Sequence, residues 1–250
     1  MSRNNQHWDP QSYKEHACFV PTFGASLIEW LNPKPKEHIL DLGCGDGILT
    51  EKIISLDCTA VGIDNSLEFV RAACSRGINA RLMNGADLQF NEEFDAVFSN
   101  AALHWMRESD SVAKGVWNAL VPNGRFVGEF GGKGNIQTIV MALYEVLEEY
   151  SVNAHSLNPW YFPSVEEYQN VLESVGFEIT RIIQFERPTV LTTGIQQWIK
   201  VFAQCFISAL PKSDQIACIN TIQSRLYPLL YKNNQWVADY VRLRFEARKI

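Results

Sequence analysis

Three glycines at every second position stand between an apolar segment and a helix-like segment in the stretch HILDLGCGDGILTEKI, residues 38–53. Glycine lacks a Cβ atom, so the backbone there can adopt left-handed conformations and come close to a ligand. The first free N–H groups of the following helix then point at that ligand. The spacing therefore predicts a loop that binds a small molecule.

The charges of this loop favour a ligand with cationic groups. A dinucleotide loop needs G-x-G-x-x-G without negative charge, because a pyrophosphate lies on it. Here Ile48 occupies the third glycine position of that motif, and Asp41 and Asp46 stand on either side of the turn. A ligand with an amino group, a sulfonium and one carboxylate fits better, since the helix N–H groups can bind the carboxylate while Asp41 binds the cations.

The elements around the loop alternate between strand and helix. Helices are expected over 47–56, 66–75 and 109–120, and strands at HILDLG, TAVGID, NARLMNG, FDAVFSN and GRFVGEF. Strands that alternate with helices indicate a parallel sheet covered on both faces. This part of the chain is therefore predicted to be a doubly wound α/β fold.

Helical patterns continue on both sides of this region. Helices are expected over 12–31, 135–150 and 164–175, two more within 194–231, and a strand over 177–186. Ser164 and Glu167 form a capping box at the start of their helix, and Met141 is expected to pack in the core.

The last segment, YVRLRFEARK, alternates apolar residues with charged ones. Arg242, Arg244 and Arg248 share one side of this alternation. A period of two predicts a strand with one buried and one solvated face, so the arginines are expected to be in water.

Composition limits the location and the partners. The chain has 250 residues, 46% of them hydrophobic, a net charge of −6 and a pI near 5.4. This balance gives no general affinity for nucleic acid or membrane surfaces. Six scattered cysteines without C-x-x-C spacing, and the lack of a long apolar run, predict a reduced cytoplasmic protein. No metal-ligand cluster is seen, so no metal is expected.

The glycine loop ILDLGCGDG resembles the S-adenosylmethionine loop of class I methyltransferases, and further landmarks of that family follow in order. Asp64 ends the second strand, where the family's acid binds both ribose hydroxyls. Asp87, in NGADLQF, is similar to the acid that reads the adenine amino group. FDAVFSNAALHWM resembles the fourth-strand motif. WDPQSY, NPWYFPS and WVADYVRLRF are similar to the trans-aconitate methyltransferase branch.

The resemblance implies S-adenosylmethionine as cofactor and a Rossmann-like class I methyltransferase sheet whose last strand is antiparallel, with a helical cap. Residues 1–250 are expected to form a single methyltransferase domain, with cap segments 1–35, 131–163 and 188–233 over a core of 36–130, 164–187 and 234–250. The cofactor-binding residues implied are Trp8, Tyr13, Asp41, Gly43, Cys44, Gly45, Asp64, Asn65, Ala86, Asp87, Leu88 and Asn100. For Trp8 and Tyr13, simple packing is an equal alternative.

The acceptor side is predicted from the residues after the fourth strand. Methyltransferases that act on planar nitrogens commonly carry Asn/Asp-Pro-Pro-aromatic there, whereas this chain has NAAL at 100–103. An oxygen of a small molecule is therefore the favoured acceptor, with a carboxylate as one candidate. His104 is the candidate catalytic residue, as a base or as a ligand to a carboxylate, with hydrogen-bonded packing as the alternative. The residues expected to face the substrate are Trp105, Trp160 and Tyr161.

Two other functions stay open from the sequence alone. One is a protein of the same fold that binds the cofactor without catalysis. The other is a nicotinamide-dependent oxidoreductase, which the acids of the glycine loop disfavour.

Overall fold

Residues 8–16 and 19–250 are described by the computed structural model, and the chain divides into two units. A sheet unit comprises Cys18–Lys133, Trp160–Phe185 and Arg242–Ile250. A helical unit comprises Met1–Ala17, Gly134–Pro159 and Glu186–Val241. The cap and core boundaries expected from the sequence stay a prediction, and positions 1–7 and 17–18 of the first cap segment lie outside the described residues.

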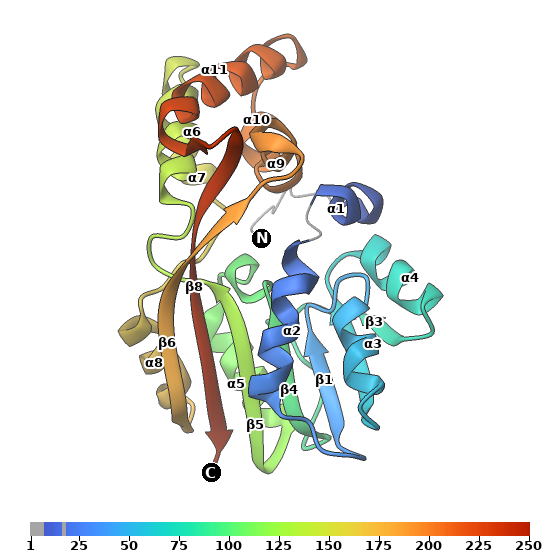
Figure 1. Cartoon of the computed structure of the whole chain (residues 1–250). Coiled ribbons are helices and arrows are strands. Elements are labelled where there is room, and N and C mark those ends of the chain that lie inside the picture. Colours follow the sequence, from blue (N-terminus) through green and yellow to red (C-terminus); the bar gives the residue numbers. More distant parts are fainter. Residues whose placement is uncertain (1–7, 17–18) are drawn as a thin grey trace. The chain divides into compact units, whose positions relative to one another are not determined.

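The sheet has the strand order β3-β2-β1-β4-β5-β8-β6, with β7 paired to β8. Strands β1 to β5 pair in parallel, and β5 pairs with β8 in antiparallel register, from Arg125 opposite Arg248 to Gly131 opposite Arg242. Figure 1 shows the arrows of β1 and β8 pointing in opposite directions. The predicted doubly wound sheet with an antiparallel last strand is thus confirmed. The strands are β1 His38–Leu42, β2 Thr59–Asp64, β3 Asn79–Leu82, β4 Phe94–Asn100, β5 Leu120–Gly131, β6 Phe177–Val190, β7 Tyr231–Lys232 and β8 Gln235–Lys249.

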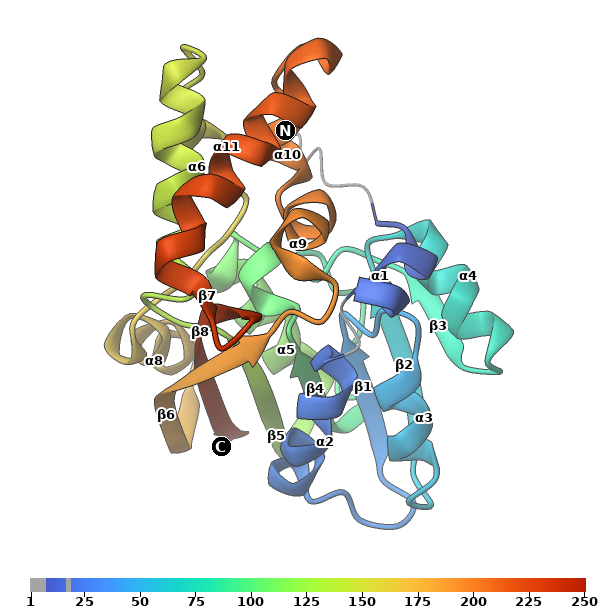
Figure 2. The same ribbon diagram turned by 45° about the horizontal axis from the view of Figure 1, so that its top comes forward.

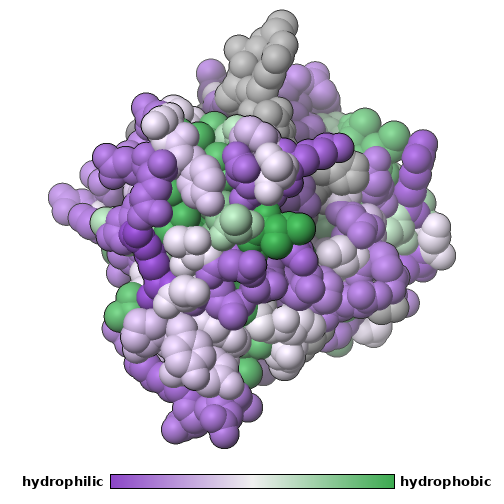
Figure 3. Space-filling view, turned by 90° about the horizontal axis from the view of Figure 1, so that it is seen from above, coloured by the Kyte–Doolittle hydropathy of each residue, from purple (hydrophilic) through white to green (hydrophobic). Residues whose placement is uncertain are grey.

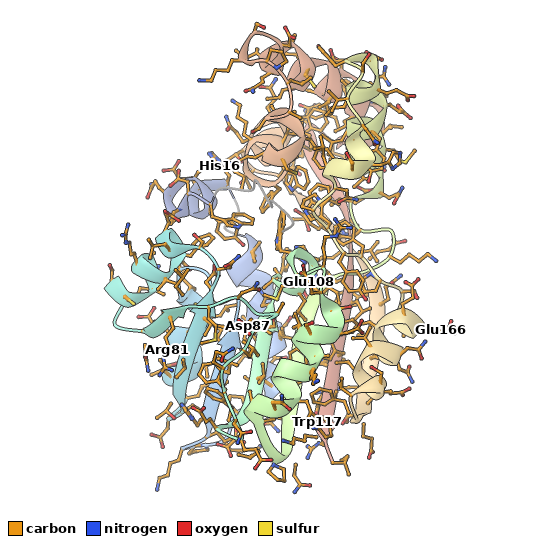
Figure 4. The ribbon with its side chains drawn as sticks, turned by 180° about the vertical axis from the view of Figure 1, so that it is seen from behind. His16, Arg81, Asp87, Glu108, Trp117 and Glu166 are labelled. Carbon is orange, nitrogen blue, oxygen red and sulfur yellow. The ribbon has the colours of Figure 1, made fainter. Side chains whose placement is uncertain are left out.

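Helices cover both faces of this sheet because alternate strand residues belong to two separate cores. Leu40 and Leu42 of β1 pack in the cluster that includes α5 and α8, whereas Ile39 packs in the cluster of α2 and α3. In Figure 1, α2 and α3 lie in front of the sheet, and Figure 4 shows α5 from the other side. The helices of this unit are α2 Phe19–Leu31, α3 Ile48–Ile54, α4 Leu67–Ser75, α5 Ser109–Ala119 and α8 Val165–Ser174.

Local capping signals place two of these helix starts. Ser66 precedes α4, and its side chain accepts a hydrogen bond from the N–H of Phe69. Ser164 precedes α8, where the Glu167 N–H donates to its Oγ at 3.2 Å and its own N–H donates to the Glu167 carboxylate at 2.7 Å. The predicted capping box is confirmed, and these bonds satisfy backbone donors that the first helical turn leaves free.

The solvated face predicted for the last strand is wrong for Arg242, Arg244 and Glu246, which are buried. Helices cover both faces of the sheet at β8, because Trp30 of α2 lies by Arg244 on one face and Phe245 packs in the cluster of α5 and α8 on the other. Arg244 forms an ion pair with Glu129 of β5 at 2.6 Å and lies over the ring of Trp30 of α2. The buried charges of Arg244 and Glu246 are therefore paired rather than hydrated, Glu246 with Arg181 at 2.9 Å.

The helical unit contains helices from distant parts of the chain. Helices α6 and α11 run side by side in Figures 1 and 2, and α1 contacts α9. The helix expected over 12–31 includes positions 17 and 18, which lie outside the described residues, and α1 and α2 lie on either side of them. Of the two helices expected within 194–231, the first is divided at Ala203. The helices of the unit are α1 Pro10–His16, α6 Gln137–Glu149, α7 Ala154–Leu157, α9 Gly194–Phe202, α10 Gln204–Ile207 and α11 Lys212–Leu230.

Met141 does not pack in the core as predicted, because its side chain is 45% exposed. The buried face of α6 is formed by its neighbours, among them Val140 and Ala142, and position 141 falls outside it.

Seen from above in Figure 3, the surface is mostly hydrophilic, with apolar side chains in green among purple ones. No helix in the described part of the chain combines the length and apolar character that a membrane span requires.

Candidate active site

The glycine loop connects β1 to α3 at the carboxyl edge of the sheet. The N–H groups of Gly43 and Cys44 both donate to the carbonyl of Ile63 in β2 at 2.9 Å, which fixes the start of the loop. Gly43 has φ +78°, and a Cβ atom there would lie 2.2 Å from the Cβ of Ala102. At Gly45, φ is +56° and a Cβ would meet nothing within 4 Å. The loop is thus packed on one side and open on the side where a ligand can approach.

Asp64, at the end of β2, is bonded to this loop. Its Oδ2 accepts the N–H of Gly45 at 3.0 Å, and its Oδ1 accepts the N–H of Ser66 at 2.9 Å. Burial raises the pKa of Asp64, and these backbone N–H groups oppose that rise. Two residues that the sequence assigned to one ligand, 19 positions apart, are thus in direct contact. Asn65 follows them and is exposed.

Asp41 is a buried acid beneath the loop. Its side chain accepts a hydrogen bond from the Thr50 hydroxyl of α3 at 2.6 Å, and only 2% of the residue is exposed. Burial, and then the charge of Asp64, raise the pKa of Asp41 to about 7. A nearby cation would stabilise the charged form of such a carboxyl and lower its pKa. Asp46, the other acid of the loop, forms an ion pair with Arg76 at 3.2 Å.

The third predicted landmark follows β3. Asn84 forms a turn in which its side-chain oxygen accepts the N–H of Ala86 at 3.0 Å, and Asp87 is exposed after it. Figure 4 labels Asp87 in this segment. Leu88 lies against Gly115 of α5, which anchors the segment to the helix. The Asp87 carboxylate accepts a hydrogen bond from Gln89, so its second oxygen is left for another donor.

The segment after β4 is tied to both neighbouring strands. Ser99 donates its hydroxyl to the carbonyl of Leu42 at 2.8 Å, and the N–H of Ala101 donates to the carbonyl of Glu129 at 2.7 Å. These bonds place Asn100 at the same edge of the sheet as the glycine loop. A short 3-10 helix, η1 (Leu103–Trp105), follows and carries His104.

His104 is almost completely buried. Its Nδ1 accepts a hydrogen bond from the N–H of Gly131 at 3.2 Å, and its carbonyl accepts the N–H of Tyr161 at 2.9 Å. Burial, and then the charge of Arg242, hold the pKa of His104 well below its usual range. The imidazole is therefore neutral at physiological pH.

Aromatic rings surround His104, and they differ in one member from the set the sequence predicted. Trp105 lies 5.5 Å from the His104 ring, Phe162 lies 5.9 Å from it, and Trp160 stacks on Phe162 at 5.8 Å. Tyr161 instead packs against the core cluster of the α5 face. Successive residues of an extended segment point in opposite directions, so Trp160 and Phe162 share a side that Tyr161 does not.

Trp8 and Tyr13 pack together within the helical unit. Their ring centroids are 5.8 Å apart, and both contact Phe202 of α9, at 6.3 and 6.1 Å. Their role toward the cofactor stays a prediction.

The sequence did not identify three residues of the site: Thr50, Gly131 and Arg242. For Arg242 the alternation of the last strand gave the wrong signal. No sequence pattern indicates the bonds of Thr50 and Gly131, because their partners lie in other elements of the fold, 9 and 27 positions away.

The fold and the residues at this edge define an α/β enzyme of the methyltransferase type. These residues also fit S-adenosylmethionine. The space at Gly45 is open, Asp64 stands at the end of β2, and a cationic ligand would stabilise the charged form of the buried Asp41.

Known proteins agree with this class. A family model described as a methyltransferase domain matches residues 40–128. An uncharacterized methyltransferase of Schizosaccharomyces pombe is 36% identical, covering 97% of this chain and 98% of its own length. A trans-aconitate 2-methyltransferase of Mycobacterium tuberculosis is 33% identical over 48% of this chain and 49% of its own. A solved geranyl diphosphate C-methyltransferase of Streptomyces coelicolor, in complex with S-adenosylhomocysteine, has a TM-score of 0.57 at 15% identity, covering 92% and 80% of the two chains.

The chain belongs to the class I S-adenosylmethionine-dependent methyltransferases. It is an enzyme, and S-adenosylmethionine is its methyl donor. The family resemblance found in the glycine loop is confirmed, and the oxidoreductase alternative does not agree with it.

Proposed function

We propose that this enzyme methylates an oxygen atom of a small molecule, with a carboxylate as the acceptor group. The observation that carries this proposal is the buried cation Arg242 of β8, which lies opposite Gly131, the residue whose N–H bonds to the His104 ring after β4. A cation at this edge attracts an anionic acceptor and disfavours an ammonium group. The partial relatives named for trans-aconitate, itself a tricarboxylate, also support an acid as substrate.

The residues of the sheet unit would hold the cofactor in distinct ways. Asp64 would bind the ribose hydroxyls, Asp87 the adenine amino group, and Asp41 would stabilise the cationic end, while Gly43 and Gly45 let the backbone come close. S-adenosylmethionine supplies a methyl group whose bond to the sulfonium breaks, with the electron pair left on sulfur, as the acceptor oxygen bonds to the carbon.

The aromatic rings beside His104 would exclude water from the acceptor. Trp105, Trp160 and Phe162 present apolar surface, and a displacement of this kind needs mainly aligned reactants in a dry site. The acceptor segment has Ala101 and Ala102 where planar-nitrogen enzymes commonly carry two prolines, which supports oxygen over nitrogen.

The cofactor assignment is tested by titration calorimetry of S-adenosylhomocysteine against Asp64→Ala. Hydrogen bonds to a charged group contribute about 1.5–3 kcal/mol each, so affinity should fall at least about tenfold. The variant Asp110→Ala, an exposed acid on α5, is the matched control and should bind normally. Unchanged affinity of Asp64→Ala would contradict the assignment.

The acceptor is tested by release of S-adenosylhomocysteine with a panel of small molecules. The panel contains mono-, di- and tricarboxylates, including trans-aconitate, together with catechols, alcohols and amines. We expect turnover with a carboxylate. Turnover confined to the amines would refute the proposal.

A further inference from the structure

The hydrogen bond between Gly131 and His104 determines which ring nitrogen carries the proton. A backbone N–H can only donate, so Nδ1 of His104 must present its lone pair. A neutral imidazole has one N–H, which therefore resides on Nε2. Among the described residues, no hydrogen bond to Nε2 is found, so this N–H is left for a ligand.

The surroundings of the ring oppose a second proton. Arg242 stands opposite Gly131 in the register of β5 and β8, and its guanidinium charge acts on the imidazole. The rings packed on His104, those of Trp105 and Phe162, are uncharged, and Tyr161 contacts it through the backbone. An imidazolium here would be both desolvated and repelled by a cation.

We infer that His104 is a fixed hydrogen-bond donor to the methyl acceptor, through Nε2–H, and is not a general base. A base needs a free lone pair, whereas Nε2 already holds a proton and the lone pair of Nδ1 is bonded to Gly131. This role rests on the proposed function, because the acceptor must then arrive already ionised, as a carboxylate does at neutral pH.

The proton balance of the transfer agrees with this role. The carboxylate oxygen forms a bond to the methyl carbon, the carbon–sulfur bond breaks with its electron pair on sulfur, and no proton is released. His104 keeps its N–H throughout. A hydrogen bond to a carboxylate is stronger than one to a neutral ester, so the same donor holds the substrate more tightly than the product.

Nitrogen NMR of the full chain labelled with 15N-histidine tests the tautomer directly. His38 is a matched internal control for the tautomer. Its Nδ1 must donate to the carbonyl of Glu93 at 2.9 Å, so in His38 the proton is on Nδ1. The His104→Gln variant assigns the His104 signals. We expect an unprotonated Nδ1 and a protonated Nε2 at His104 across the pH range in which free histidine titrates. A proton on Nδ1, or a charged ring, would overturn the inference.

Kinetics of two variants separate a donor from a base. Glutamine supplies an amide N–H near the position of Nε2 but cannot take up a proton, whereas alanine supplies neither. With trans-aconitate, or the best carboxylate of the panel, His104→Ala should lose about 10- to 100-fold in kcat/KM and His104→Gln should keep most of it. Both should bind S-adenosylhomocysteine normally.

The outcomes distinguish this inference from the proposed function. Equal loss in His104→Gln and His104→Ala, with both variants folded by their melting temperatures, would refute the donor role. If no carboxylate of the panel is methylated, the proposed function fails, and the nitrogen shifts still decide the position of the proton.

Discussion

Replacing Asp41 by asparagine should stabilise the protein at high pH and weaken cofactor binding. The carboxyl is buried, and its pKa is raised from 3.8 to about 7, mainly by loss of hydration and further by the charge of Asp64. The hydrogen bond from Thr50 favours the charged form but does not offset burial. Asparagine has nearly the same shape, carries no charge, and can still accept this hydrogen bond.

The sign and the size of the effect follow from the pKa shift. A raised carboxyl pKa means that the folded state binds the proton more tightly than the unfolded state, so stability falls as the pH rises from 3.8 to about 7. A shift of roughly three units corresponds to about 4 kcal/mol, lost in full above this range. Asp41→Asn avoids this loss, so its advantage should be near zero in acid and largest in alkali.

Urea unfolding of the wild type and Asp41→Asn at acidic, neutral and alkaline pH measures this difference. Thr50→Val is a useful companion, because removing the donor should raise the pKa of Asp41 further and steepen the pH dependence. Titration calorimetry of S-adenosylhomocysteine should show weaker binding to Asp41→Asn, since the amino group of the ligand loses a charged partner. A difference in unfolding free energy that does not change with pH would refute the reasoning.

Two further predictions concern packing. Gly77→Ala should lower the free energy of unfolding by about 1–2 kcal/mol, from its left-handed backbone alone, because a Cβ there meets nothing within 4 Å. Gly43→Ala adds a steric clash and should also lose S-adenosylhomocysteine binding. Equal effects of the two variants in thermal melting and calorimetry would contradict this. Arg244→Met should cost about 3–5 kcal/mol in urea unfolding because it breaks the buried ion pair with Glu129. Arg248→Met, half exposed, should stay within about 0.5 kcal/mol, and equal effects of the two variants would contradict the prediction.

Features that depend on neighbours along the chain could be predicted from the sequence. The glycine loop, the capping box of Ser164 and Glu167 and the alternation of strands and helices are local patterns, because turn, cap and helix geometry involve residues a few positions apart. The sequence also predicted that one edge of the sheet carries Asp41, Asp64 and Asp87, since parallel strands bring their carboxyl ends to one edge.

Features that depend on the partner of a strand could not be predicted in this way. A period of two separates the faces of the last strand, but it does not say what covers each face. Helices packed on both faces of the sheet cover β8, so Arg242 and Arg244 are buried and their charges are part of the interior. The same limit applies to the helix face that leaves Met141 exposed.

The sequence by itself determined the family and the cofactor, because these reside in short motifs, and the acids that it assigns to the cofactor stay a prediction. The tertiary structure decided the chemistry of His104, since its proton position depends on Gly131, which is 27 positions away, and its neutrality depends on burial and on Arg242. A histidine in a sequence can be a base, a donor or a packing residue. Only the groups that the fold brings to its two nitrogens distinguish these roles.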